Sequence, residues 1–199
     1  MFGNKLSFKS RRGVTLLELI VAMSIWLFMS SLTYAMFISA SRSWIKVSQK
    51  ATLLQRFEVL AGKVQREVSG SSRSSVTISP DQSALSFLSA STDNPNQPYQ
   101  FGAQGRLQWQ KFVVYYHDSV SGGVFRTETP LTTPSIRSVV IDSLGGGGIN
   151  SYLIDGQPIA LNVTECDFRL RNGKLVMDVS FKEGRDTLSM SSTNDIRNE

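Results

Sequence analysis

The chain has 199 residues, enough for one ordinary domain with an additional segment, and 41% of them are hydrophobic, as in folded rather than disordered chains. The formal net charge is +5, but the first 13 residues hold four basic side chains and no acid, and removing these four from the 21 basic residues leaves 17 against 16 acidic ones. A nearly neutral body disfavours a polyphosphate binder, and one cysteine excludes an intramolecular disulfide.

The first predicted element is an apolar run without any charge, residues 19–41. Its 23 residues give a helix of about 35 Å, which exceeds the roughly 30 Å of a hydrocarbon core. The run is too long for the apolar part of an ordinary signal peptide, and no matching cleavage site follows it. Basic residues are denser before the run than after it, where Arg42 and Lys46 follow. The positive-inside rule therefore predicts a cytoplasmic N-terminus.

One acidic residue, Glu18, lies at the start of this run. A carboxylate inside a membrane costs about 3 kcal/mol, so we expect Glu18 either to reach the interface or to meet a cation. If the chain is cut after Gly13, the new amine of Val14 is a cation at the same depth. Helix geometry is expected to point this amine away from Glu18 of the same chain. The predicted partner is therefore a neighbouring chain.

The segment RRGVTLLELIVAMSIW resembles the class III signal sequence of type IV prepilins and pseudopilins. The shared features are a short basic leader ending in glycine, an apolar run, and a glutamate at the fifth position after the cut. The resemblance implies cleavage after Gly13, N-methylation of Val14 and an assembly role for Glu18. Val14 is itself a departure, because the family usually has phenylalanine there.

The resemblance also implies where the protein works and with which partners. It implies a single-pass protein of the inner (cytoplasmic) membrane, with a cytoplasmic N-terminus and a periplasmic or extracellular globular domain, which later enters a filament. The implied partners are other pilin or pseudopilin subunits, a prepilin peptidase, an inner-membrane assembly platform and membrane lipid. Residues 1–13 are then the leader peptide.

The helix is predicted to continue beyond the membrane. Apolar residues step by four or three positions, which is the period of one helix face; they are Leu53, Phe57, Leu60, Val64 and Val68. We predict one helix, with a transmembrane half over 14–41 and an amphipathic half over 42–68 that packs on the protein's own sheet. The polar run SGSSRSS at 69–75 is expected to end the helix.

Residues 69–199 are predicted to form a β-rich globular domain. Short runs rich in β-branched and aromatic residues predict strands; they are 74–80, 83–90, 112–118, 122–130, 137–143 and a meander over 161–199. RNGK at 171–174 and KEGRD at 182–186 predict hairpin turns. Val176, Val179 and Phe181, together with Met177 and Ser180, indicate a half-buried strand. The fold class is therefore α+β, a long N-terminal helix on a mainly antiparallel, pilin-like sheet.

The helix followed by a meander is similar to the J-type minor pseudopilins of type II secretion and to the W-type minor pilins. The similar stretches are LLQRFEVLAGKVQREV, FVVYYHDSVSGGVFRTETP and the tail DIRN. The missing C-terminal disulfide loop favours a minor subunit, and Glu18 argues against the K-type tip subunit. The expected function is a non-enzymatic subunit of the tip or initiation complex of a type IV pilus or type II secretion pseudopilus. Secretion, adhesion, twitching and DNA uptake stay open.

Other chemistry has less support. Cys166 and His117 offer a nucleophile and a base, but a buried core cysteine and a strand-end histidine explain them better. Gly145–Gly148 lacks the Lys-Ser/Thr of a phosphate loop and is expected to be a connector. Five loop aspartates lack the spacing of a calcium loop; they are Asp81, Asp93, Asp118, Asp142 and Asp155. We therefore predict no catalytic residue, no metal and no cofactor.

Aromatic residues leave a second function open. Trp44 is expected to anchor the span at the interface, and Trp26 is expected to pack against a neighbouring helix. Several rings and two basic residues suit either a single-stranded DNA surface or a half-buried strand; they are Arg106, Trp109, Lys111, Phe112, Tyr115 and Tyr116. The alternative is therefore a membrane-anchored ligand- or DNA-binding protein of a competence or adhesion system. A membrane-tethered enzyme is a third possibility.

Overall fold

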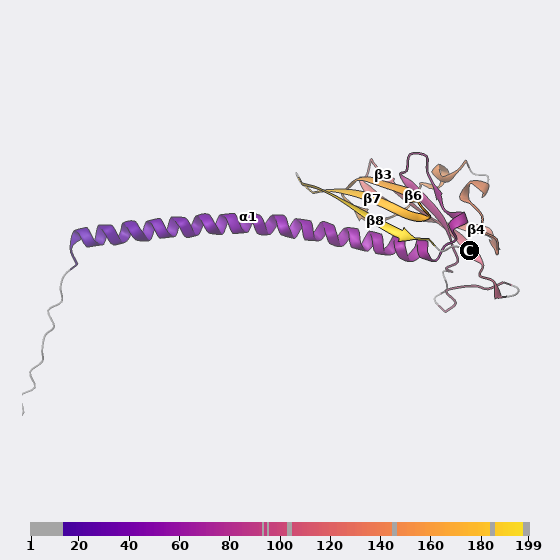
Figure 1. The fold of residues 1–199 in the computed structure, drawn as a ribbon, viewed down its shortest axis with the longest axis horizontal. Coiled ribbons are helices and arrows are strands. Elements are labelled where there is room, and N and C mark those ends of the chain that lie inside the picture. Colours follow the sequence, from indigo (N-terminus) through magenta and orange to yellow (C-terminus); the bar gives the residue numbers. More distant parts are fainter. Residues whose placement is uncertain are drawn as a thin grey trace, which may run out of the picture. The chain divides into compact units, whose positions relative to one another are not determined.

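The structure is a computed structural model that describes residues 14–92, 94, 96–102, 105–144, 147–183 and 186–196. Contacts divide the chain into two units, Met1–Ser48 and Gln49–Glu199, which are described separately below. The helix α1 (Leu16–Ser69) has 54 residues and runs from the first unit into the second (Figure 1). The prediction of one helix over about 14–68 is therefore confirmed within two residues.

The described part of the first unit is helical from Leu16 onward, and none of its side chains is buried. Apart from the half-buried Ile38, its large hydrophobic residues are about half exposed or more, from 48% at Leu32 to 78% at Leu16. By length and composition this helix is able to cross a membrane. In water such a surface is unfavourable, so this segment needs lipid or other helices around it.

The helix has a different character in the second unit. Leu53, Leu60, Val64 and Val68 are buried, and Phe57 packs partly buried against the same core. The predicted apolar stripe is confirmed. The helix ends at Ser69, and the N–H of Ser71 donates to the carbonyl oxygen of Val68 at 3.0 Å. The serine-rich run therefore ends the helix as expected.

Two antiparallel sheets complete the second unit. The five-stranded sheet has the order β1-β2-β3-β4-β5, and the three-stranded sheet has the order β6-β7-β8. The strands of the first sheet are β1 (Thr77–Ile78), β2 (Ala84–Ser89), β3 (Trp109–Asp118), β4 (Gly123–Ser135) and β5 (Gln157–Leu161). Those of the second are β6 (Val163–Arg171), β7 (Lys174–Glu183) and β8 (Asp186–Asp195). All neighbouring strands are antiparallel, so the predicted α+β class is confirmed.

The main core joins the helix to both sheets. Its large side chains come from β2, β3, β6 and β7 as well as from α1, and they include Phe87, Tyr115, Phe168 and Phe181. A second core covers the other residues of β2 and β3, with Phe112 and Val114 against Ile141 and Ile149. Because both sets of alternating side chains are buried, β3 is the central strand of the body.

One predicted strand is wrong. Residues 137–143 do not form a strand, and a 3₁₀ helix, η3 (Ile141–Leu144), occupies the end of this segment. The N–H of Ser143 donates to the carbonyl oxygen of Val140 at 3.0 Å, and Ile141 is buried in the second core. Local β-propensity is therefore overridden by a turn that lets Ile141 reach the core. The short strand β5, which contains Pro158, was not anticipated.

The hairpin predictions and the half-buried strand between the two turns are confirmed. Asn172 and Gly173 have φ of 50° and 77° and connect the paired residues Arg171 and Lys174. Glu183 lies opposite Asp186, so the second hairpin forms where expected, although residues 184–185 lie outside the described ranges. In β7 the buried residues are Leu175, Met177, Val179 and Phe181. Val176 lies on the opposite face from Val179, and the strand is half-buried as predicted.

Candidate functional site at the start of helix α1

The carboxylate of Glu18 forms a capping box at the helix start. Its Oε2 accepts hydrogen bonds from the N–H of Thr15 at 3.0 Å and from Thr15 Oγ1 at 3.1 Å. In return the N–H of Glu18 donates to Thr15 Oγ1 at 3.3 Å. Thr15 immediately precedes the first helical residue, so two N–H groups without helical partners are satisfied.

The capping box was missed from the sequence, although the Thr-x-x-Glu spacing of Thr15 and Glu18 is its usual signal. The carboxylate folds back toward the start of its own helix, where a negative charge also interacts well with the helix dipole. Glu18 thus bonds to Thr15, the residue that directly follows Val14. The carboxylate therefore lies closer to the start of its own chain than expected from the sequence. Any pairing between Glu18 and a neighbouring chain has to compete with this cap.

The residues around the processing position are only partly described. Val14 is 72% exposed, and no ion pair joins Glu18 to another residue in the described ranges. Gly13 lies outside the described residues. Cleavage after Gly13 and methylation of Val14 therefore stay predictions.

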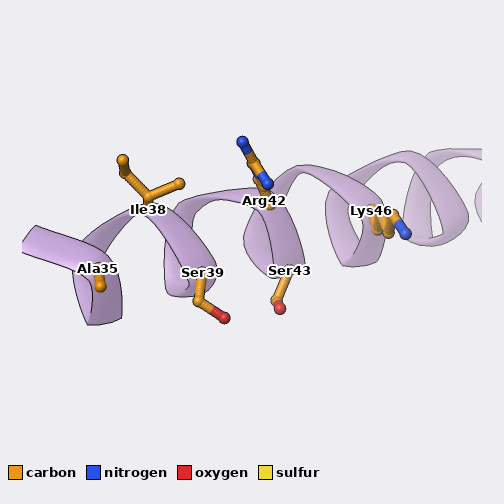
Figure 2. Close-up of a pocket in the computed structure, with 6 residues that line it drawn as sticks. All are labelled: Ala35, Ile38, Ser39, Arg42, Ser43 and Lys46. Atoms are coloured by element: carbon orange, nitrogen blue, oxygen red, sulfur yellow. The ribbon is translucent and has the colours of Figure 1, made fainter.

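A shallow hollow lies farther along the same helix, lined by Ala35, Ile38, Ser39, Arg42, Ser43 and Lys46. Figure 2 shows the side chains of Ile38 and Arg42 on one side of this hollow and those of Ser39 and Ser43 on the other. Ala35, Ser39 and Ser43 recur every four residues. Small residues at this spacing let another helix backbone approach closely.

The aromatic residues of the helix up to Ser48 are all exposed. Trp26 is 68% exposed, Tyr34 67% and Trp44 75%. Trp26, Tyr34 and Phe37 line a second hollow on the helix surface. These rings are therefore available to lipid or to neighbouring helices.

Cys166 and His117 have separate structural roles. Cys166 is 2% exposed, and burial raises the pKa of its thiol, with the charges of Asp167 and Asp178 adding to the effect. A thiol held protonated is a poor nucleophile. His117 Nε2 lies 3.2 Å from the carbonyl oxygen of Val163.

The aromatic rings of the proposed DNA surface point into the protein. Trp109, Phe112, Tyr115 and Tyr116 are all at most 7% exposed, and the Nζ of Lys111 donates to Glu128 Oε2 at 2.6 Å. These rings offer no face on which a base can stack. The structure agrees with the interpretation of this segment as a strand.

Asp81 and Asp118 accept hydrogen bonds within turns. Asp118 accepts hydrogen bonds from the Ser121 hydroxyl at 2.6 Å and from the N–H of Val120 at 3.0 Å, and these bonds lower its pKa. Among the described residues, no three histidine, cysteine or acidic side chains come close enough together to hold a metal ion. Asp93, Gly145 and Gly146 lie outside the described ranges. Gly147 and Gly148 have φ of 87° and 82° and lead into a 3₁₀ helix, η4 (Ile149–Tyr152).

A polar cluster at the other end of α1 was also missed. Tyr115 and Arg126 are cross-strand partners on β3 and β4, and both donate to Glu67 Oε2, at 2.8 Å and 3.0 Å. Arg126 and Lys111 both pair with Glu128. No pattern along the sequence signals this cluster, because it depends on the β3–β4 register.

The pKa values of this cluster follow from burial and charge. Burial raises the pKa of the Tyr115 hydroxyl, and the charge and hydrogen bond of Glu67 raise it further, so Tyr115 remains a donor. For Glu128, burial acts to raise the pKa, but hydrogen bonds and charges from Lys111 and Arg126 outweigh burial and lower it. Glu128 is therefore ionised at neutral pH and pairs with the charged side chains of Lys111 and Arg126.

Comparison with known proteins adds no relative: no family model, no curated protein and no solved structure matches this chain. The interpretation of the site therefore depends on its own residues. These are the capped carboxylate of Glu18 and the exposed apolar helix that follows it.

Proposed function

We propose that this chain is a minor pilin or minor pseudopilin, a structural subunit of the tip or initiation complex of a type IV pilus or type II secretion pseudopilus. The observation that supports this most is the division of helix α1. Up to Ser48 no described side chain of the helix is buried, whereas the later residues include Leu53, Leu60 and Val64 in the core of an antiparallel body. One helix thus supplies a membrane anchor with its first half and part of the core of the body with its second half. This division suits a filament subunit whose body is attached through the helix.

The proposed mechanism has two steps. A prepilin peptidase hydrolyses the bond after Gly13 and methylates the new amine of Val14. Glu18 then exchanges its hydrogen bonds with Thr15 for an ion pair with the Val14 amine of a neighbouring subunit. In an apolar surrounding such a pair is stronger than in water, and it satisfies a carboxylate that is otherwise costly to bury.

The surface of the helix supports the packing step. Ala35, Ser39 and Ser43 leave a hollow into which a neighbouring helix fits closely. The exposed rings of Trp26 and Tyr34 line a separate hollow and give apolar area for contact with a further helix. The alternative, an anchored ligand- or DNA-binding protein, is less favoured because the rings on β3 are buried.

The mature N-terminus tests the proposal. The full chain is expressed with and without a prepilin peptidase, purified from membranes and analysed by mass spectrometry. With the peptidase we expect the mass to lose residues 1–13, and Val14 to carry a methyl group. An intact leader under these conditions, or a cut beyond residue 40, contradicts the proposal.

A further inference from the structure

The edges of the two sheets differ in how they are protected. An open edge strand presents unpaired N–H and C=O groups, and proteins usually cover or interrupt it. In the five-stranded sheet, β1 has only two residues and β5 has five, including Pro158. The part of β4 beyond its pairing with β5 contains Pro130 and Pro134. These edges are poor templates for another strand.

The first strand of the three-stranded sheet is partly covered by the other sheet. The N–H of Val163 donates to the carbonyl oxygen of Gly122 at 3.0 Å. The N–H of Phe168 donates to the carbonyl oxygen of Gln82 at 2.8 Å. Both bonds lie on the side of β6 away from β7, so β6 is not a free edge at these points.

The last strand, β8, is neither short nor interrupted by proline, and of its residues Asn194 is buried. All ten residues pair with β7, without the register shifts that interrupt the β3–β4, β4–β5 and β6–β7 pairs. It contains no proline, lysine or arginine, and residues 187–194 are uncharged. No backbone hydrogen bond to its outer side is formed by any residue in the described ranges. Figure 1 shows β8 with β7 beside it.

Backbone geometry defines what can bind there. In an antiparallel ladder, alternate residues direct both N–H and C=O toward one neighbour, so about half of the residues of β8 direct theirs to the open side. Only another extended backbone pairs with such a row. The strand also has two distinct faces, with Leu188 and Met190 partly buried against the main core and Ser189 and Ser191 exposed.

We propose that β8 is an interaction surface that accepts an extended strand from another protein as the fourth strand of the β6-β7-β8 sheet. The fitting partner alternates apolar residues, opposite Leu188 and Met190, with polar ones. A second copy of β8 fits less well, because Leu188 and Met190 are its only large apolar residues. This proposal concerns the body alone and goes beyond the pilin-like role.

The probe is a synthetic peptide with the β7 sequence Lys174–Glu183. This sequence already pairs with β8 in the structure, with Phe181 opposite Leu188 and Val179 opposite Met190. The control peptide has the same sequence with methylated backbone nitrogens, so it has no N–H groups to donate. Amide hydrogen exchange of the full chain in detergent micelles is measured residue by residue.

Strand addition leaves a distinctive pattern. With the unmodified peptide we expect alternate β8 amides to exchange about tenfold more slowly, while the intervening ones, already bonded to β7, do not change. The methylated peptide is expected to change nothing. Protection of consecutive residues, protection away from β8 or no protection overturns the proposal. Protection that rises with protein concentration alone also overturns it, because the occupant is then a second copy.

Two proline variants supply a matched pair. Ser191→Pro and Ser192→Pro each remove one N–H, and because the ladder alternates, only one of the two N–H groups faces outward. The outward variant is expected to keep the fold, judged by circular dichroism, and to lose the peptide-dependent protection. The inward variant is expected to destabilise β8. Retained protection in the folded outward variant contradicts strand addition.

Discussion

At the scale of single residues, Glu18 has two uses for one carboxylate. Within its own chain it completes the cap with Thr15, through bonds of 3.0 Å and 3.1 Å. In the proposed assembly it meets the amine of another chain. The two uses differ in what they require: a cap needs an acceptor, whereas an ion pair needs a charge. Substitutions at Glu18 and Thr15 therefore separate them.

Glu18→Gln is expected to be cleaved and inserted in the membrane but poorly incorporated into filaments, because glutamine keeps the acceptor and removes the charge. Thr15→Ala is the matched control, since it weakens the helix start by about 1 kcal/mol and leaves the carboxylate in place. Incorporation is measured as the variant's share in sheared filament fractions. Normal incorporation of Glu18→Gln rules out the ion-pair mechanism.

Glu128 makes the stability of the body depend on pH. Its pKa is lower in the folded chain than in the unfolded chain, where the pKa of a glutamate is about 4.3. The unfolded state therefore binds the proton first as the pH falls. The contribution of Glu128 is present above about pH 5 and is lost as the pH falls through the folded value.

The matching variant is Glu128→Gln, compared with the unaltered chain by denaturant unfolding from pH 7 to pH 3. The unaltered chain is expected to be more stable at neutral pH, and the difference is expected to shrink below about pH 5. Acid sensitivity from Asp118 remains in both chains and cancels. A difference that is constant over the whole range shows that the ion pairs of Glu128 contribute nothing.

At the scale of elements, sequence patterns predicted those features of helices and turns that depend on one segment of the chain alone. The spacing from Leu53 to Val68 gave the helix face, and the Asn-Gly pair gave the turn at Asn172. Residues 137–143 have strand propensity, yet Ile141 turns into the second core, and this depends on the rest of the fold. The bonds of Glu67 to β3 and β4 depend on strand register, which no local pattern encodes. The cap at Glu18 was readable but was overlooked.

Leu60→Ala tests how the second part of α1 packs. Leu60 is fully buried in the main core, so truncation is expected to cost about 2–5 kcal/mol of unfolding free energy. Leu54→Ala is the matched control on the same helix, because Leu54 is 46% exposed and its loss is expected to cost much less. Both are measured by denaturant unfolding in micelles. Equal losses show that the helix does not pack by this face.

At the scale of the whole molecule, the two units have different solvent requirements. The body buries large apolar side chains in two cores, whereas the described part of the first unit buries none. The first unit is stable only where its exposed apolar surface meets lipid or other helices. The first unit is therefore expected to determine whether the protein enters a membrane or stays in water, whatever the body binds.

Leu32→Arg tests this partition. An arginine near the middle of the apolar run is expected to lower insertion by about 3 kcal/mol and to move the protein out of the alkaline-resistant membrane fraction. Val59→Arg is the control, since Val59 is a 58% exposed residue of the same helix in the second unit. Its fractionation is expected to be unchanged. If both variants stay in the membrane fraction, the apolar run is not the anchor.

The contact of Glu67 with the sheet has a mechanical consequence. A single carboxylate oxygen near the end of α1 holds Tyr115 on β3 and Arg126 on β4, which are directly opposite each other in the ladder. A tension carried along the helix thus reaches two strands at one point and is shared between them. It passes into the central strand of the body rather than into an edge that can peel.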